Sequence, residues 1–434
     1  MGPLVTRHFH EAWTMLSRRS FLKTVPVVTA PLIWTRTSRA AASEKLTLGF
    51  IGLGTMGRGH LGSFLGRNSV EVVAVCDVVQ ERLESAAGMV GKKYADRTKS
   101  GSYPGVRSYT DFRKLLDQPG LDAVVIATPD HWHTIPCLLA AKAGKHIYCE
   151  KPLTHHVSEG RELSDTVKAA KIAFQTGSQQ RSEYSGHFRK AVEYVWNGRI
   201  GTLKRIRIGV GEPARPCDLP TQETPAGTDW DMWLGPAPDR GYHEDLCPKG
   251  VHKHFPAWRK YQEYGGGQIA DMGAHHFDIA QWALGMDASG PVKIEPPEGD
   301  KKQGLRFVYA NGVEMFHGGP SGCTFEGGVG TIYVDRDKIE SKPKSILEEP
   351  LGDKDVKLYH ATDHRKNWLE CIASKKPTIC PAEVGHRTAS VCHLANIGYQ
   401  LRRALKWDPV KEQFVDDAEA NKLVARAMRE PWKL

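Results

Sequence analysis

Six residues near the start of the chain constrain its fold more than any other feature: Gly52-Leu53-Gly54-Thr55-Met56-Gly57, a G-x-G-x-x-G sequence. An apolar run at 46–51 predicts a β-strand before them, and the residues after Met56 have the pattern of a helix. In such a unit two glycines permit a tight turn and the close approach of a pyrophosphate to the helix N-terminus. The third permits helix–strand packing. The sequence therefore predicts a dinucleotide-binding site.

Asp77 ends the next predicted strand, 70–76, about twenty residues after Gly57. A carboxylate at this point can accept hydrogen bonds from ribose hydroxyls and repels a 2′-phosphate, so we expect NAD rather than NADP. A glycine-rich turn without a ligand is the alternative, and the strand, helix and acid together argue against it. The cofactor-binding residues assigned to this unit are Gly52, Gly54, Thr55, Met56, Gly57 and Asp77.

From residue 45 to 152 predicted strands alternate with predicted helices. Apolar runs predict strands at 46–51, 70–76, 123–127 and 146–149, and amphipathic stretches predict helices at 81–94, 110–116, 134–143 and 157–170. This alternation is typical of an α/β fold with a doubly wound parallel sheet, the Rossmann arrangement. Because 434 residues exceed what one core normally holds, we expect two folded domains, at 43–165 and 166–434.

The pattern changes after residue 172. Strands are predicted at 203–210, 305–309 and 331–334, Asn311-Gly312 is typical of a type I′ hairpin turn, and 383–405 predicts a long helix. The second domain is therefore expected to be α+β with a large, mostly antiparallel sheet. Residues 212–264 contain eight prolines and little periodicity, which favours a functional lid or binding loop.

The first 42 residues have the pattern of a twin-arginine (Tat) export signal. Arg18-Arg19 precedes an apolar run at 25–34 and three alanines at 40–42 that suit a signal peptidase. The apolar run is half of the ~20 residues that span a bilayer, so no stable membrane span is expected. We expect interaction with the Tat machinery, which carries folded proteins, and a periplasmic or otherwise exported location. Met15 is an alternative start.

Net charge gives little support for nucleic-acid binding. The formal charge is +9, but residues 1–42 hold six of the 59 basic residues and one of the 50 acidic ones, which leaves +4 for the remainder. That remainder has no dense basic block, so its lysines and arginines are interpreted as solvated surface. Nine cysteines form no C-x-x-C pair and are odd in number, so we expect mostly buried thiols.

Two polar clusters follow predicted strands of the first domain, where ligands of open parallel sheets bind. The first is Ala127-Thr128-Pro129-Asp130-His131-Trp132-His133, and the second ends in Glu150-Lys151-Pro152. A lysine at such a strand end can hydrogen-bond a substrate hydroxyl and help to move its proton, although a single lysine would more simply be a solvated cation. The further residues assigned to the cofactor are Thr128, Pro129, His133, Glu150 and Lys151.

The order and spacing of three motifs resemble the Gfo/Idh/MocA oxidoreductases, over roughly residues 45–409. The motifs are the glycine turn, Glu150-Lys151-Pro152, and the stretch 265–278, which contains G-G-G-x-x-x-D-x-G-x-H. The resemblance implies that Lys151, Asp271 and His275 surround the nicotinamide and the reacting carbon. It also implies a cis Lys151–Pro152 bond and frequent self-association through the second-domain sheet, so a homo-oligomer is expected.

Asp271 and His275 lie four residues apart, so on a helix they would share one face and could converge on one substrate hydroxyl. We expect His275 to take the hydroxyl proton, Asp271 to orient it or bind a neighbouring hydroxyl, and Lys151 to stabilise the developing oxyanion. Lys151 and His275 could exchange roles. The residues assigned to the substrate are Gln179, Arg181, Trp230, Trp258 and His276.

No metal is predicted. The histidines at 252, 254, 275 and 276, with Asp271, form no recognised zinc pattern, although a bound cation would also explain their clustering. The sequence thus favours an NAD-dependent oxidoreductase acting on a secondary hydroxyl of a sugar or glycoside. A glycoside hydrolase that recycles NAD is the main alternative. A non-catalytic NAD or sugar sensor is a third, against which Lys151, Asp271 and His275 argue.

Overall fold

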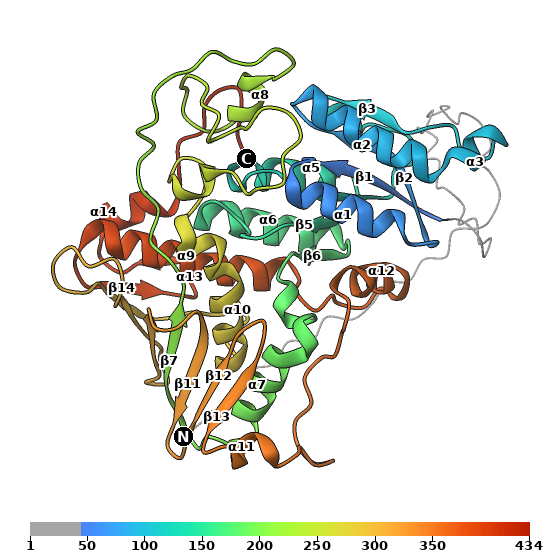
Figure 1. The fold of residues 1–434 in the computed structure, drawn as a ribbon. Helices are drawn as coiled ribbons and strands as arrows, with labels where there is room; N and C mark the ends of the chain where they lie inside the picture. The colour runs from blue at the N-terminus through green and yellow to red at the C-terminus, as the bar shows by residue number, and fades with distance from the viewer. Residues whose placement is uncertain (1–44) are drawn as a thin grey trace, which may run out of the picture. The chain divides into compact units, whose positions relative to one another are not determined.

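The computed structural model describes residues 45–434, and the predicted Tat signal lies outside the described residues. The first sheet has six strands, all parallel, in the order β3-β2-β1-β4-β5-β6 (Figure 1). Its strands are β1 (Leu46–Ile51), β2 (Val70–Cys76), β3 (Arg107–Tyr109), β4 (Ala123–Ile126), β5 (His146–Cys149) and β6 (Phe174–Thr176). The edge strand β6 follows the expected domain boundary at 165.

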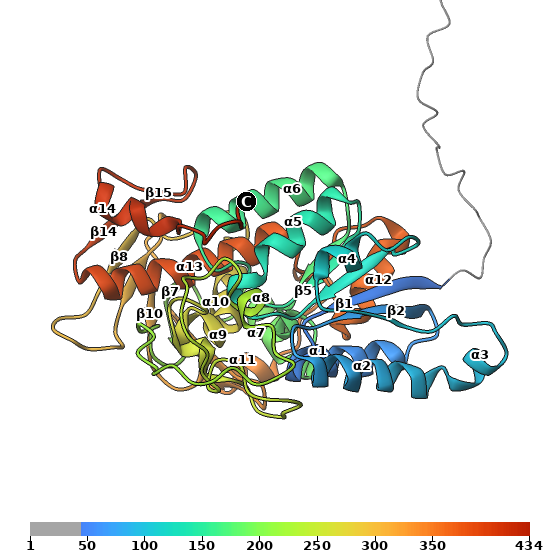
Figure 2. The ribbon, with the colours of Figure 1, turned by 90° about the horizontal axis from the view of Figure 1, so that it is seen from above.

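Helices cover both faces of this sheet (Figure 2). They are α1 (Thr55–Leu65) and α2 (Gln80–Lys93) on one face, and α4 (Phe112–Leu116), α5 (Thr134–Lys142) and α6 (Val157–Ala170) on the other. Each face has its own buried apolar cluster, one around Phe50 and Phe64 and one around Ile126 and Leu163. A later helix, α12 (His364–Ser374), returns to the α1 side and buries Trp368 there. The predicted doubly wound arrangement is confirmed.

The second sheet has nine strands in the order β13-β12-β11-β7-β10-β9-β8-β14-β15. Neighbours are antiparallel except β7 and β10, which are parallel, so the predicted mostly antiparallel sheet is confirmed. The strands are β7 (Leu203–Gly209), β8 (Lys293–Glu295), β9 (Arg306–Val308), β10 (Glu314–His317), β11 (Gly322–Gly327), β12 (Thr331–Val334), β13 (Ile339–Lys342), β14 (Leu405–Asp408) and β15 (Gln413–Phe414).

Three helices cover one face of the second sheet: α7 (His187–Trp196), α10 (Gly273–Leu284) and α13 (Ala382–Leu401). Helix α13 also packs against α6, so it joins the two sheets. It ends earlier than predicted because Arg402 takes a left-handed conformation with φ of 53°. The remaining helices are α3 (Ala95–Lys99), α8 (Trp230–Leu234), α9 (Gly267–Asp271), α11 (Ser345–Glu348) and α14 (Ala418–Asn421).

The β9–β10 hairpin is present, but its predicted type I′ turn is wrong. Gly312 has φ of 83°, whereas Asn311 is not left-handed, and a type I′ turn needs positive φ at both positions. The Gly312 N–H donates to the Tyr309 oxygen at 2.9 Å, and the Tyr309 N–H donates to the Val313 oxygen at 3.0 Å. This is the longer hairpin loop, in which a type I turn precedes one left-handed glycine.

Residues 212–264, called the covering segment below, contain little regular structure beyond α8 and a short 3-10 helix, Ala257–Lys260. The segment has a small apolar core of its own, which includes Trp233, Tyr242 and Tyr264. All nine cysteines are free and eight are buried, as predicted. Within residues 45–434 no helix combines the length and the apolar character that a membrane crossing requires.

Candidate active site

The glycine turn between β1 and α1 has the geometry that a dinucleotide requires. Gly52 has φ of 84°, and a Cβ on it would lie 2.7 Å from the Ala127 carbonyl oxygen. A Cβ on Gly57 would lie 1.9 Å from the Gly52 oxygen, so the absence of a side chain there lets α1 approach β1. Apart from its two chain neighbours, no residue within 45–434 has a heavy atom within 4 Å of the Cβ position of Gly54. The space in front of Gly54 and the α1 N-terminus is therefore open to a pyrophosphate.

Asp77 supports this turn from the end of β2. Its Oδ2 accepts the Leu53 N–H at 2.6 Å, and its Oδ1 accepts the Val79 N–H at 2.9 Å. The carboxylate also lines the cleft beside the turn, where the ribose of a dinucleotide would lie. We call this the dinucleotide cleft. Predicted cofactor residues that line it are Gly52, Gly54, Thr55, Met56, Asp77, Thr128 and Pro129.

The covering segment forms the opposite wall of the dinucleotide cleft. The Asp229 N–H donates to the Val78 oxygen at 2.9 Å, and the Gln80 N–H donates to the Gly227 oxygen at 2.9 Å. Arg82 donates through Nε to the Gly250 oxygen at 2.9 Å, so this guanidinium ties the segment to α2. The predicted lid is thus placed over the cleft by backbone contacts at several points.

A second chamber continues from the dinucleotide cleft, because the two cavities share Met56, Thr128 and Trp258 in their walls. Lys151, which follows β5, is one of its lining residues. The other two predicted catalytic residues, Asp271 and His275, line the same chamber. The predicted substrate residues Gln179 and Trp258 do so as well.

Lys151 is held by two oxygens of Asp271. Its Nζ donates to Asp271 Oδ1 at 2.6 Å and to the Asp271 carbonyl oxygen at 3.0 Å. The carbonyl oxygen of Asp271 is free for this contact because the helix is interrupted between α9 and α10. There the His275 N–H donates to the Met272 carbonyl oxygen instead. Burial opposes ionisation of Asp271, but the charges of Lys151 and Arg259 outweigh it and lower the pKa of this carboxyl.

His275 lies in the first turn of α10 and is 5% exposed. Its Nδ1 is buried and has no hydrogen-bond partner within residues 45–434. Burial, followed by the positive charges of Lys151 and Arg336, lowers the pKa of His275 well below its ordinary value. The imidazole is therefore neutral near pH 7 and can accept a proton from a bound hydroxyl.

Glu150 is fixed beside Lys151 by a buried network. It accepts hydrogen bonds from His60 Nε2 at 2.7 Å and from Gln179 Nε2 at 2.8 Å. Arg365 Nε donates to His60 Nδ1 at 2.9 Å, so the proton of a neutral His60 ring is on Nε2. Burial alone would raise the pKa of Glu150, but His60 and Lys151 bring it down to about 2. Glu150 is a fixed anion behind the lysine.

Three buried polar atoms in the two cavities lack partners within the described residues: Thr128 Oγ1, His252 Nε2 and His275 Nδ1. Buried polar atoms are normally hydrogen-bonded, so these three indicate a bound ligand or water. Together with the open space at Gly54 they fit a dinucleotide whose nicotinamide end reaches the second chamber.

Comparison with known proteins agrees with this geometry. A family model described as the NAD-binding Rossmann fold of an oxidoreductase family matches residues 46–178, and the C-terminal alpha/beta domain of that family matches residues 214–434. The chain belongs to the Gfo/Idh/MocA oxidoreductase family. Its cofactor is accordingly NAD, which Gly52, Gly54, Thr55 and Asp77 are placed to bind.

Relatives of this Gfo/Idh/MocA protein include myo-inositol 2-dehydrogenase of Thermotoga maritima, 22% identical over 84% of this chain and 99% of that one. A glycosyl hydrolase family 109 protein of Stenotrophomonas maltophilia is 29% identical over half of each chain. Among solved structures, the WlbA dehydrogenase of Bordetella pertussis, in complex with NADH and UDP-GlcNAcA, aligns with a TM-score of 0.58 at 18% identity. That alignment covers 84% of this chain and 99% of the other.

Three predicted substrate residues do not reach the second chamber. Arg181 is buried and pairs with Asp278 at 2.8 Å, so it stabilises the protein interior. Trp230 stacks on Trp233 at 4.7 Å and donates to the Arg240 oxygen at 2.8 Å, which anchors the covering segment. His276, at 2% exposure, packs near Phe188 and does not line the chamber. The structure thus places these three predicted substrate residues outside the chamber that Lys151, Asp271 and His275 line.

His133, predicted to bind the cofactor, lines the second chamber but supports the loops around it. Its Nδ1 lies 2.9 Å from the Pro152 oxygen and its Nε2 lies 3.0 Å from the Thr128 oxygen. Burial lowers its pKa, so the ring is neutral and donates to one carbonyl at a time. His133 therefore fixes the position of Thr128 and does not offer a free nitrogen to NAD.

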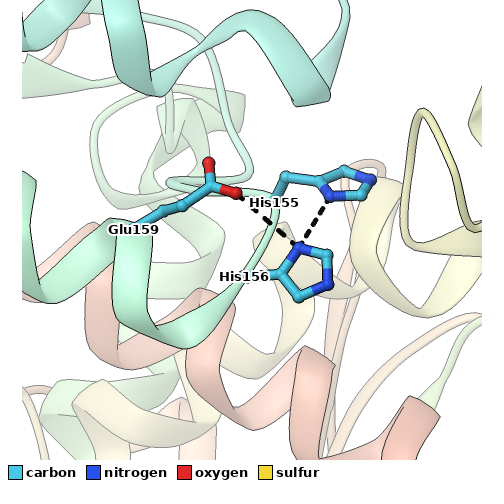
Figure 3. Close-up of side chains that lie close together, drawn as sticks. All are labelled: His155, His156 and Glu159. Atoms are coloured by element: carbon cyan, nitrogen blue, oxygen red, sulfur yellow. Dashed lines mark hydrogen bonds and ion pairs between the residues drawn. The ribbon is translucent and has the colours of Figure 1, made fainter. Parts of the chain in front are cut away.

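The histidines weighed as metal ligands do not assemble. Within residues 45–434 one group has ligand atoms close enough for a metal ion, and it is a different one: His155, His156 and Glu159 (Figure 3). Glu159 already accepts hydrogen bonds from Arg426 Nε at 2.6 Å and from Thr134 Oγ1 at 2.5 Å. A cation would have to displace the guanidinium. We therefore interpret this cluster as the anchor of the C-terminal segment.

Sequence reasoning missed several residues of the second chamber. Asp130, in the 127–133 stretch, is not among the predicted site residues. Burial raises its pKa to about 8, so it is mostly protonated near pH 7. The basic residues Arg259, Arg336 and Arg365 come from three separate segments. No local signal marked these arginines, because only the tertiary fold brings them together.

Proposed function

We propose that this protein oxidises a secondary hydroxyl of a sugar or glycoside with NAD. The observation that supports this most directly is the Lys151–Asp271 pair beside the unpartnered His275 nitrogen, in a chamber continuous with the dinucleotide cleft. Relatives in the family include a myo-inositol 2-dehydrogenase and a 1,5-anhydro-D-fructose reductase. Both names denote substrates that are polyhydroxylated rings.

The residues of the chamber have separate roles in this reaction. NAD, when it is bound, would accept the hydride from the substrate carbon. Neutral His275 accepts the hydroxyl proton, and the Lys151 ammonium donates a hydrogen bond to the same oxygen as negative charge develops there. Asp271 holds Lys151 in position through both of its contacts. The reverse assignment, with Lys151 as the base, is the alternative for this pair.

A second candidate is a glycosidase that uses NAD without consuming it. Oxidation of one ring carbon acidifies the neighbouring C–H bond, the C1 substituent leaves, water adds, and the carbonyl is reduced back. Two observations favour it: the similarity to glycosyl hydrolase family 109 proteins, and the covering segment, whose contacts with Val78 and α2 would retain a bound dinucleotide.

One experiment separates these functions. The protein is loaded with NAD and given a panel of sugars and glycosides, while NADH, released sugar and C2–H exchange in heavy water are followed. A dehydrogenase accumulates NADH in proportion to substrate. The glycosidase releases sugar and exchanges C2–H at constant NAD. Tight NAD binding with neither activity would instead identify a sensor and contradict both proposals.

We also propose export through the Tat pathway, supported by Arg18-Arg19 and the apolar run that follows. Changing both arginines to lysine should leave the protein in the cytoplasm, as judged by cell fractionation. Deleting residues 1–14 should not change export if Met15 is the start. An unchanged exported fraction after the double substitution would refute the proposal.

Self-association through the second sheet is the remaining proposal. The face without helices carries half-exposed pairs such as Arg207–Glu326 at 2.7 Å, with Phe316 beneath the guanidinium. We expect a dimer or larger assembly by light scattering, which Phe316→Glu should dissociate. If the protein were monomeric at micromolar concentration, the proposed self-association would be excluded.

A further inference from the structure

Arg336 is a cation in the second chamber without an acidic partner. It lies between β12 and β13, and its Nε donates to Gln180 Oε1 at 3.1 Å. The guanidinium carbon lies 4.8 Å from the centroid of the Tyr184 ring. Within residues 45–434 no carboxylate oxygen lies within 4.0 Å of its nitrogens. Within the same residues its Nε makes the one hydrogen bond of the guanidinium, and neither terminal amino group has a hydrogen-bond partner.

The other lysine and arginine side chains that line the chamber each have a carboxylate oxygen within 4.0 Å. The pairs are Lys151–Asp271 at 2.6 Å, Arg259–Asp271 at 3.6 Å and Arg365–Glu183 at 3.4 Å. Glu150 is the remaining anion, bound at 2.7 Å by the neutral His60 ring. Asp130 faces the same chamber, but burial keeps it mostly protonated near pH 7. Among the described residues that line this chamber, Arg336 is therefore the cation without a carboxylate within 4.0 Å, and the four cations outnumber the three remaining carboxylates by one.

Arg336 is also fixed relative to the proposed base. Gln180 accepts from Arg336 with its Oε1 and donates with its Nε2 to the His275 carbonyl oxygen at 3.2 Å. One buried amide thus sets the position of Arg336 against the backbone of His275. A ligand that spans the two residues would have an anionic group at one end and a reacting hydroxyl at the other.

We propose that the substrate is a sugar with a carboxylate, such as a uronic acid or its glycoside, and that Arg336 binds this carboxylate through its two terminal amino groups. The proposal rests on the proposed function, because the reacting hydroxyl must face His275. A guanidinium held through Nε and one ring face presents a planar fork that matches two carboxylate oxygens. One unmatched positive charge suits a carboxylate better than a phosphate monoester, which carries nearly two charges near pH 7.

The test measures kcat/KM for glucuronides and for the matching glucosides, with the NAD-loaded protein and its variants. Glucose 6-phosphate is included to test for a preference for phosphate. We expect a higher kcat/KM for the uronide. Arg336→Gln should lower the ratio of uronide to neutral kcat/KM on the order of 100-fold, mainly through KM, because a charged bidentate contact is lost. Arg336→Lys should give an intermediate ratio, since the charge remains and the fork is lost. Arg107→Gln, at an exposed position on the edge strand β3 of the first sheet, is the matched arginine control.

A wild-type preference for the neutral glycoside or the phosphate, or an Arg336→Gln variant that leaves the ratio unchanged, would overturn the proposal. A second measurement distinguishes failure of the proposed function from failure of the carboxylate site. If no sugar is turned over, calorimetric titration of the NAD-loaded protein with glucuronate still measures the anion site. Binding that Arg336→Gln weakens would then support the carboxylate site, and no binding of glucuronate would refute it.

Discussion

The Lys151 ammonium is bound by the side chain and by the main chain of Asp271, at 2.6 and 3.0 Å. The second contact exists because the helix is interrupted at Met272, which releases the Asp271 carbonyl oxygen. The 265–278 motif therefore does more than place two polar groups on one helical face. It forms a two-oxygen support that points Lys151 into the second chamber.

Lys151→Met should lower kcat by about 10²- to 10⁴-fold, because the hydrogen-bond donor for the developing oxyanion is lost. Asp271→Asn should have a smaller effect, since the carbonyl contact remains. NAD binding, measured by fluorescence titration, should persist in both variants. Lys142→Met, an exposed lysine at the end of α5, is the control and should behave as wild type. Equal losses in Lys142→Met would contradict the assignment.

The pH profile tests whether His275 is the base. Burial and the charges of Lys151 and Arg336 lower its pKa well below 6.5, so the ring stays neutral as pH falls towards that value. kcat/KM should therefore remain level down to pH 6.5 and fall only below it. His275→Gln should abolish most of the activity and the fall of kcat/KM at low pH. His360→Gln, at an exposed position, should leave both the activity and the pH profile unchanged. An acid limb above neutrality would point to another base.

Three glycines of the turn and α1 should respond differently to alanine. Gly57→Ala should destabilise the protein, because its Cβ would lie 1.9 Å from the Gly52 oxygen. Gly54→Ala should keep the melting temperature but weaken NAD binding, since its methyl group would enter open space needed by the pyrophosphate. A Cβ on Gly59 would meet no atom of residues 45–434 within 4 Å beyond the helix's own backbone, so Gly59→Ala should stabilise the exposed helix surface by up to about 1 kcal/mol. Unchanged NAD affinity in Gly54→Ala would contradict this view of the turn.

Asp77 should determine the choice between NAD and NADP. Its carboxylate lines the cleft and accepts two backbone N–H groups. Asp77→Asn keeps an acceptor but removes the charge, so it should reduce the preference for NAD by about 10-fold or more. Asp77→Ala should relax the preference as well and also destabilise the turn, because two buried donors lose their partner. The ratio of kcat/KM for the two cofactors measures the effect, and an unchanged ratio in both variants would contradict it.

The sequence was most informative where the signal was local. Runs of apolar residues gave the bounds of β1, β2 and β5, and motif order brought Lys151, Asp271 and His275 to one chamber. It was least informative where a residue's partner comes from far along the chain. Arg336 follows β12 in an ordinary turn, and only the fold brings it beside Gln180, 156 residues earlier. The helix interruption at Met272 could not be predicted either, because the four-residue spacing of Asp271 and His275 is also compatible with an unbroken helix.

Arg181 shows the same limit, and its role can be tested directly. It was expected to contact substrate, but its guanidinium pairs with Asp278 at 2.8 Å and with Asp287 at 2.7 Å, and it lies over the Trp282 ring. Arg181→Met leaves the fully buried Asp278 without its partner, so the free energy of unfolding should fall by about 3–5 kcal/mol. Chemical denaturation measures this loss.

Adding Asp278→Asn to Arg181→Met should recover part of that stability, because the uncompensated buried charge is removed. In the folded fraction of either variant, the relative kcat/KM for different sugars should equal that of wild type, since Arg181 does not line the second chamber. If Arg181→Met instead kept full stability and changed sugar preference, the side chain would contact substrate after all, and the interior ion pair would not be its function.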